Sequence, residues 1–173
     1  AAKEGKFKAL WAIGYDILMT NPNANETRRA LDQVDLVIVQ DMFMNATARE
    51  YADVFLPAAS SFEKDGTFMN GERRIQRVRG AALPQGQARS DWEIMCEIAK
   101  VMGKGEHFAF QTAQEIWDEV RSLWPDGAGI SYERLDEVGG LQWPCYDESD
   151  PGRPILHQEE FTHGKTTALR RIE

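Results

Sequence analysis

The stretch that decides the fold is VDLVIVQDMF, residues 34–43. Residues 34–39 are rich in β-branched side chains and nearly continuous in apolar ones, which is typical of a central parallel strand covered on both faces. Gln40 and Asp41 follow directly. Their polar side chains are therefore expected at the carboxyl end of the most buried strand, the edge at which open parallel sheets bind their ligands.

Two shorter apolar segments flank this strand along the chain. Residues 7–13 end at Gly14, and residues 53–56 (DVFL) stop at Pro57, so each reads as a buried strand followed by a turn. Three such strands within about fifty residues, separated by two helical stretches, predict a βαβαβ unit and a doubly wound sheet.

Capping residues indicate where the two intervening helices begin. Asn25 is placed to cap a helix that runs through Leu31, and Asn45 or Thr47 can open a second helix that runs through Tyr51. We therefore expect the α/β class, with a Rossmann-like parallel sheet that has helices on both faces in a three-layer αβα arrangement.

The pattern changes after residue 59. Residues 60–71 are polar and rich in turn residues, residues 72–80 alternate as a partly exposed strand does, and Ser90 with Glu93 forms a capping-box sequence. Three amphipathic helices are expected, over 91–102, 111–123 and 132–138. The expected segments are 1–59 (βαβαβ unit), 60–89 (a small β excursion and linker), 90–145 (helical continuation) and 146–173 (a C-terminal helical and linker tail without a core of its own).

The composition limits the class of protein. The chain has 173 residues, 42% of them hydrophobic, and a formal charge of −8 from 20 Lys+Arg and 28 Asp+Glu. This apolar share is sufficient for a core, and the negative charge opposes non-specific binding to nucleic acids or membrane surfaces. No segment approaches the roughly 20 apolar residues of a membrane span, and no signal-peptide pattern opens the chain. We expect no nucleic-acid partner, no membrane insertion and an N-terminus that is a cut in a longer chain.

The cysteines and histidines predict no metal site. Cys96 and Cys145 lie far apart in the sequence, without a CxxC motif or a His at ligand spacing. Cys96 falls within an apolar-periodic helix, where a buried thiol is typical. No nucleophile–base pair and no carboxylate dyad is visible, so we assign no catalytic residue.

Polar residues at the ends of the expected strands are the candidate binding residues. Neither GxGxxG nor a P-loop is present. Asp41 can accept two N–H bonds from a guanine edge or bonds from ribose hydroxyls, and it can equally cap the following turn. Lys64, in the charged turn EKDG, can meet a phosphate or be solvated, and Asp91 fits the first turn of a helix. The four arginines of residues 72–79 can meet a pyrophosphate, a neighbouring domain or carboxylates of their own chain.

Three motifs, in this order, resemble a known family. VIVQDMF (37–43), TAREYADVFLPAASSFEKDGTFMNGERRIQRVR (47–79) and ARSDWEI (88–94) are similar to the molybdopterin-dependent oxidoreductases of the dimethyl-sulfoxide-reductase superfamily. The segment 113–145, which ends in GLQWPC, is most similar to the α, or catalytic, subunit of formate dehydrogenases. The chain resembles a fragment of such a subunit.

The resemblance implies a cofactor. Subunits of this family hold molybdenum or tungsten between two molybdopterin guanine dinucleotides (Mo-bisMGD), with an iron–sulfur cluster and the Cys or selenocysteine metal ligand in segments that this chain lacks. The fragment is expected to supply part of a dinucleotide-binding domain, and its last segment, 146–173, to lead toward a missing C-terminal barrel.

The family pattern also implies cofactor-binding roles for six positions: Gln40, Asp41, Asn45, Lys64, Asp91 and Asp16. The first two match a pair that holds the guanosine, and Asn45 falls where a Thr commonly contributes. Lys64 matches a cofactor-contacting lysine, and Asp91 matches a carboxylate that reads guanine. Asp16 lies in the loop near the pyrophosphate, although Ile17 stands where the family usually has Pro.

We predict that this chain binds molybdopterin guanine dinucleotide within a formate dehydrogenase α subunit, which oxidises formate to CO2 only when intact. The alternatives are a fragment of another molybdopterin oxidoreductase, such as a nitrate reductase, and a non-catalytic interaction module that uses the face of Arg73–Arg79. The expected partners are the remaining domains of the same subunit, electron-transfer subunits and formate, and the expected location is cytoplasmic.

Overall fold

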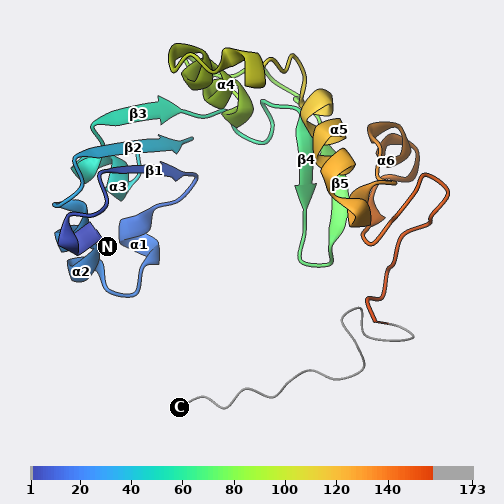
Figure 1. Ribbon diagram of the computed structural model, residues 1–173, viewed down its shortest axis with the longest axis horizontal. Helices are drawn as coiled ribbons and strands as arrows, with labels where there is room; N and C mark the ends of the chain where they lie inside the picture. The colour runs from blue at the N-terminus through green and yellow to red at the C-terminus, as the bar shows by residue number, and fades with distance from the viewer. Residues whose placement is uncertain (1, 158–173) are drawn as a thin grey trace. The chain divides into compact units, whose positions relative to one another are not determined.

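The computed structural model describes residues 2–157 and divides the chain into two units. Unit 1 comprises Ala1–Asp65 and Arg79–Phe110, and unit 2 comprises Gly66–Val78 and the residues from Gln111 onward. Unit 1 holds a three-stranded parallel sheet, and unit 2 holds a three-stranded sheet whose pairings are antiparallel (Figure 1). The mixed α/β class is confirmed.

Unit 1 follows the alternation of strands and helices that the sequence predicts. Its elements are β1 (Ala9–Ile13), α1 (Ile17–Thr20), α2 (Ala24–Leu31), β2 (Leu36–Asp41), α3 (Ala46–Tyr51), β3 (Val54–Pro57) and α4 (Asp91–Val101), with short 3-10 helices at Ala2–Glu4 and Gly105–His107. The strand order is β1-β2-β3, so β2 is the central strand, as expected. The sequence did not predict the short helix α1, because four residues are too few to show a helical periodicity.

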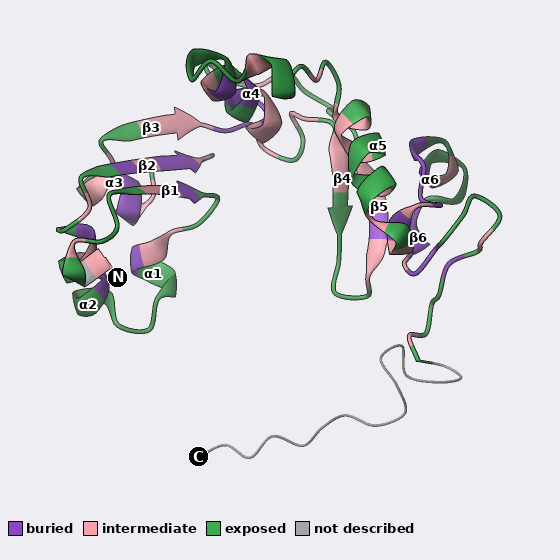
Figure 2. Cartoon of the chain, in the orientation of Figure 1, coloured by how far each residue is buried: buried purple, intermediate pink, exposed green. Residues whose placement is uncertain are grey.

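The core of unit 1 lies on one face of this sheet. Val37 and Val39 of β2 pack with Ala12 of β1 and Ala48 of α3, and Val39 is fully buried. Figure 2 shows this buried band along β2 and on the facing side of α3. Because side chains alternate along a strand, Gln40 points to the opposite face from Val39.

The helix caps differ from the expected ones at one place. Asn23, and not Asn25, caps α2: its side chain accepts a hydrogen bond from Glu26 N at 3.1 Å, and Asn25 lies inside the helix. The prediction for Asn25 was therefore wrong by two residues, because a cap must precede the first helical residue and Ala24 is already helical. Asn45 caps α3, and Ser90 N–H donates to the Glu93 carboxylate at 2.9 Å in the expected capping box of α4.

Unit 2 contains a hairpin that the sequence reading only half predicted. Its elements are β4 (Gly66–Met69), β5 (Arg74–Val78), α5 (Ala113–Leu123), a 3-10 turn at Pro125–Gly127, α6 (Tyr132–Val138) and β6 (Leu141–Gln142). The stretch 60–71 was expected to be a polar turn, yet its end forms β4 and pairs antiparallel with β5. The reason is that Phe68 and Met69 are both exposed, so β4 carries no apolar alternation that would mark it as a strand.

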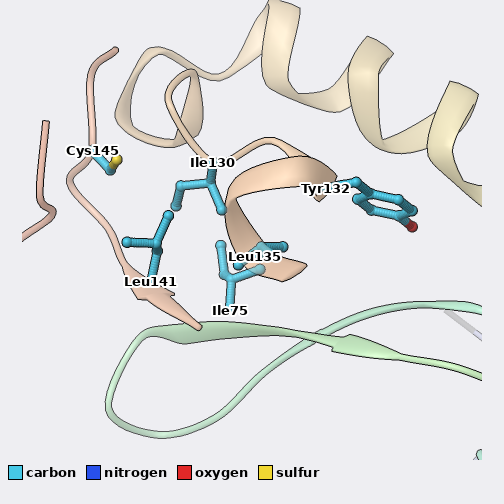
Figure 3. Packing of buried hydrophobic residues seen from close by; sticks show 6 residues of the cluster. All are labelled: Ile75, Ile130, Tyr132, Leu135, Leu141 and Cys145. Atoms are coloured by element: carbon cyan, nitrogen blue, oxygen red, sulfur yellow. The ribbon is translucent and has the colours of Figure 1, made fainter. Parts of the chain in front are cut away.

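A separate core holds unit 2 together. Ile75 of β5, Leu135 of α6 and Leu141 of β6 point toward one another, with Ile130 and Cys145 beside them (Figure 3). The side chains of Ile130 and Cys145 are fully buried. The single inward-facing position Ile75 therefore fixes which face of the arginine-rich strand β5 is covered.

The part of the tail that the structure describes is tied to this core. The Arg134 guanidinium donates to the backbone carbonyl oxygens of Gly129, Asp147 and Asp150, at 2.5, 3.2 and 2.7 Å. Gly152 (φ +78°) lies so close to Gln142 that an added Cβ would approach its carbonyl oxygen to 2.5 Å. The segment up to residue 153 thus belongs to unit 2, whereas the expected linker residues 158–173 lie outside the described part. Within residues 2–157, no helix combines the length and the hydropathy that crossing a bilayer requires.

Candidate functional site

Gln40 and Asp91 meet at the carboxyl end of the parallel sheet of unit 1. Gln40 is fully buried, and its Nε2 donates to Asp91 Oδ1 at 2.8 Å. The pairing follows from the backbone, because Arg89 N–H donates to the Pro57 carbonyl oxygen at 3.2 Å and Ala59 N–H donates to that of Arg89 at 2.8 Å. This extension of β3 places the first turn of α4, and with it Asp91, beside the end of β2.

Lys64 completes this cluster from the loop after β3. Its Nζ lies 2.5 Å from Asp91 Oδ2, and the two side chains are 30% and 34% exposed. Asp91 therefore has one donor on each carboxylate oxygen, and both oxygens keep lone pairs for a ligand. Since the pair is reached by solvent, its contribution to stability is small, and the cluster is better understood as an oriented acceptor than as a structural ion pair.

Asp41 and Asn45 form a second cluster next to the first. Asn45 Nδ2 donates to Asp41 Oδ2 at 2.9 Å, and Phe43 N–H donates to Asp41 Oδ1 at 3.3 Å. Asn45 Oδ1 in turn accepts from Ala48 N–H at 2.8 Å, as the cap of α3. Asp41 thus makes the turn contact that one reading of the sequence offered. Its contact with a nucleoside, and that of Asn45, stay predictions.

Asp16 lies in the loop after β1, and its carboxylate accepts hydrogen bonds from the first turn of α3. Its carboxylate accepts from Ala46 N–H at 3.1 Å, from Thr47 N–H at 3.2 Å and from the Thr47 hydroxyl at 2.6 Å. Burial alone would raise the pKa of Asp16, but the hydrogen bonds from Thr47 and Ala46 outweigh it and lower the pKa below its ordinary value. A direct contact of Asp16 with a pyrophosphate stays a prediction. Thr47, which the sequence offered only as a helix cap, is fully buried between these groups.

The donor and acceptor chemistry of these clusters fits a guanine nucleotide. Guanine presents N–H donors on one edge, and Asp91 and Asp41 are acceptors; Lys64 supplies a positive charge for a phosphate. One further acceptor is in place, because the buried Gln40 Oε1 has no hydrogen-bond partner among the described residues. An orphaned acceptor of this kind marks a site that a donor from outside the chain would complete.

The arginines at and just before β5, Arg73, Arg74 and Arg77, make their contacts within unit 2, and Arg79 belongs to unit 1. Arg73 donates to the carbonyl oxygens of Trp143 and Arg153, and Arg74 donates to that of Gly140. Arg77 lies 3.6 Å over the Tyr132 ring and 3.5 Å from Asp136. Arg77 and Arg74, which lies 3.7 Å from the Glu72 carboxylate, thus pair with carboxylates of their own chain, as one of the three interpretations of this basic stretch expected, whereas Arg73 contacts backbone carbonyl oxygens.

Metal-ligand geometry is absent from the described residues. Within 2–157, no three His, Cys, Asp or Glu side chains are grouped so that they could hold a metal ion. Cys96 is buried as expected, and burial raises the pKa of its thiol. A cavity of about 570 Å³ lies between β3 and α4, lined by Leu56, Ile94 and Ile98 among others, but none of the six predicted site residues lines it.

Comparison with known proteins decides the family. The family model described as molybdopterin oxidoreductase matches residues 1–101. This chain belongs to the molybdopterin oxidoreductase family. Membership supports a molybdenum or tungsten pterin as the cofactor of the subunit to which the chain contributes. All six predicted site positions lie within the matched residues.

Several members of the family are similar to nearly the whole chain. The chain is 47% identical over 154 residues to an F420-dependent formate dehydrogenase α subunit of Methanococcus maripaludis, covering 89% of this chain and 22% of the relative. It is 42% identical to formate dehydrogenase H of Escherichia coli (92% and 22%) and 38% identical to the assimilatory nitrate reductase catalytic subunit of Bacillus subtilis (92% and 23%). The chain thus spans about a fifth of the length of these relatives.

A solved structure supports the fold as well. Acetylene hydratase from Pelobacter acetylenicus superimposes with a TM-score of 0.60 at 25% identity, over 79% of this chain and 18% of that protein. The names of these four proteins cover three activities, those of formate dehydrogenase, nitrate reductase and acetylene hydratase, so similarity over this part of the chain does not by itself identify a substrate.

Proposed function

We propose that this chain binds the guanine dinucleotide end of a molybdopterin guanine dinucleotide within a formate dehydrogenase α subunit. The observation that carries the proposal is the cluster of Gln40, Asp91 and Lys64, in which a carboxylate is oriented by a buried amide and faced by an ammonium group. In this proposal Asp91 accepts the N–H groups of the guanine edge, Asp41 accepts from the nucleoside, and Lys64 meets phosphate charge.

In this proposal, the residues of this chain bind the cofactor and orient it, and they take no part in the redox step. Gln40 holds Asp91 from the buried side, and Asn45 holds Asp41, so both acceptors are fixed before the ligand arrives. When bound, the molybdenum or tungsten pterin supplies the redox chemistry of the subunit. The dinucleotide form of the cofactor, an iron–sulfur cluster elsewhere in the subunit, electron-transfer subunits as partners and a cytoplasmic location are parts of the same proposal.

Formate is the proposed substrate of the whole subunit. Support comes from the formate dehydrogenase relatives, which share 41–47% identity with this chain, against 38% for the nitrate reductase. Nitrate is the second candidate substrate, because that relative is matched over 165 residues. Anaerobic assays of the full-length subunit with formate and with nitrate, each coupled to a redox dye, separate the two.

The test of the binding proposal is the variant Asp91→Asn in the full-length subunit. An amide offers one acceptor oxygen where the carboxylate has two, and it presents N–H groups to the N–H edge of guanine, so we expect the guanine content per molybdenum or tungsten to fall at least severalfold. The matched control is Asp35→Asn, which breaks another Lys–Asp pair of unit 1, to Lys8, just before β2 begins. Equal guanine content in both variants would overturn the proposal.

A further inference from the structure

The Thr47 hydroxyl joins two loops at the proposed nucleotide site. Thr47 Oγ1 donates to Asp16 Oδ1 at 2.6 Å and accepts from Leu18 N–H at 3.1 Å. Asp16 and Leu18 belong to the loop and short helix after β1, whereas Thr47 belongs to α3, after β2. The side chain is fully buried, so no ligand contacts it. Its hydrogen bonds fix the two strand-exit loops against each other.

The first turn of α3 is satisfied by side chains of the chain itself. The N–H groups of Ala46 and Thr47 donate to Asp16, and that of Ala48 donates to Asn45. These are three of the donors that a helix leaves unpaired at its start. This helix end is therefore used to position its neighbours and has no free donors for a phosphate group.

The same turn reaches the proposed nucleoside ligand. Asn45 caps α3 through its Oδ1 and, through its Nδ2, holds Asp41 Oδ2 at 2.9 Å. A change in the seating of α3 against the first loop would therefore move Asn45 and, with it, the Asp41 carboxylate. The path from Thr47 to Asp41 runs through the first turn of α3 to Asn45 and from there through the Asn45–Asp41 hydrogen bond.

We propose that Thr47 and Asp16 form a positioning latch for guanine dinucleotide binding, with Asp16 acting through α3 and not as a direct ligand. The inference rests on the proposed function, because it needs a nucleotide at Asp41 to have an effect. The latch keeps the acceptor of the nucleoside in place, and its loss speeds release of the cofactor without removing any group that touches it.

The test uses the full-length subunit loaded with cofactor and compares four variants. Thr47→Val keeps the shape of the side chain and removes the hydroxyl, whereas Thr47→Ser keeps the hydroxyl and removes the methyl group. Thr27→Val is the matched control. Thr27 is also buried in unit 1, and its hydroxyl donates to the carbonyl oxygen of Asn23, the cap of α2, at 3.0 Å and accepts from Asn21 Nδ2 at 3.3 Å. It therefore also joins the segment after β1 to a helix, but to α2 and not to α3. Asp91→Asn reports on the proposed function itself. The readouts are the melting temperature and the rate at which guanine nucleotide is lost during timed anaerobic incubation and gel filtration.

The expected result is that Thr47→Val releases guanine nucleotide roughly tenfold faster than the parent, the size of a charge-assisted hydrogen bond. Thr47→Ser should behave as the parent, and Thr27→Val should lower the melting temperature with unchanged release. If Asp91→Asn speeds release but the two Thr→Val variants do not differ, the latch is refuted and the binding site stands. If Asp91→Asn leaves release unchanged, the binding site is refuted, and the latch with it.

Discussion

Replacing Gln40 by Leu should weaken cofactor retention while leaving the stability of unit 1 nearly unchanged. Gln40 is fully buried and makes one hydrogen bond, through Nε2 to Asp91, while its Oε1 is unpaired among the described residues. Leu fills a similar volume and carries no polar atom. The substitution therefore removes the stabilising hydrogen bond to Asp91 and, at the same time, the buried oxygen that has no hydrogen-bond partner.

The two terms have opposite signs and similar sizes. A hydrogen bond to a charged group contributes about 1.5–3 kcal/mol, and the lower end applies because Asp91 is 34% exposed, so that water replaces the lost donor. A buried acceptor without a partner costs about 1–3 kcal/mol, and this cost disappears with Leu. The net change in the free energy of local unfolding should stay within about 1.5 kcal/mol in either direction.

Hydrogen exchange of the strand β2 in the cofactor-free, full-length subunit measures this local quantity. Gln40→Leu should change the exchange rate of a peptide covering β2 by no more than about tenfold, since 1.4 kcal/mol corresponds to a factor of ten. The matched control is Val39→Ala, one position earlier and equally buried. It removes two methyl groups from the core at a cost of about 2 kcal/mol, or about thirtyfold in rate.

Cofactor retention should separate the two variants in the opposite order. Gln40→Leu frees the Asp91 side chain on one oxygen and should speed the loss of guanine nucleotide, whereas Val39→Ala leaves Asp91 with both donors. A loss of more than about 3 kcal/mol from Gln40→Leu would refute the reasoning, because Oε1 would then have a strong donor elsewhere in the subunit. Unchanged retention would show that Asp91 needs no orienting amide.

Three further predictions concern single interactions. The pKa of Asp16 is lowered, so its contribution to stability is complete above its ordinary pKa of 3.8 and is lost as the pH falls through the lower value of the folded state. Hydrogen exchange at α3, corrected for its intrinsic pH dependence, should therefore accelerate only below about pH 4. Acceleration already at pH 5 would contradict this. Arg134→Met should cost about 3 kcal/mol locally through three lost carbonyl contacts and expose the 145–153 segment to proteolysis; a protease-resistant segment would contradict it. Asn23→Ala should cost α2 about 1 kcal/mol by hydrogen exchange, and Asn25→Ala should cost less than about half of that; the reverse order would restore Asn25 as the cap.

The central strand and its exit could be predicted from sequence because the signal is local. The continuous apolar run of residues 34–39 identifies β2, and the two polar residues after it identify the ligand edge. The capping box of α4 is also a local signal, and it places Asp91 in the first turn of a helix. No local pattern predicts that this turn lies against Gln40, 51 positions earlier. That contact depends on the backbone hydrogen bonds between Arg89 and the residues at the end of β3.

The features that the sequence did not reveal depend on groups with no pattern. The strand β4 is half exposed, so its side chains do not alternate. The 145–153 segment is held by backbone carbonyl oxygens, which every residue has, around one guanidinium. Thr47 is one of several threonines, and its contacts with Asp16 and Leu18, 31 and 29 positions earlier, distinguish it. Periodicity predicts which side chains are buried, but it does not predict which buried polar groups find each other.

The chain and its proposed ligand both carry net negative charge. The proposed site avoids repulsion because its carboxylates face the guanine edge of the ligand and not its phosphates. A dinucleotide carries its negative charge on phosphates, while its guanine edge presents N–H donors. Asp91 and Asp41 suit that edge, and the Lys64 ammonium, 2.5 Å from Asp91, is the positive charge of this cluster. The start of α3, the other natural place for an anion, is already neutralised by Asp16. In the proposed function, this chain therefore contacts the nucleoside, and other parts of the full-length subunit hold the pterin and its metal.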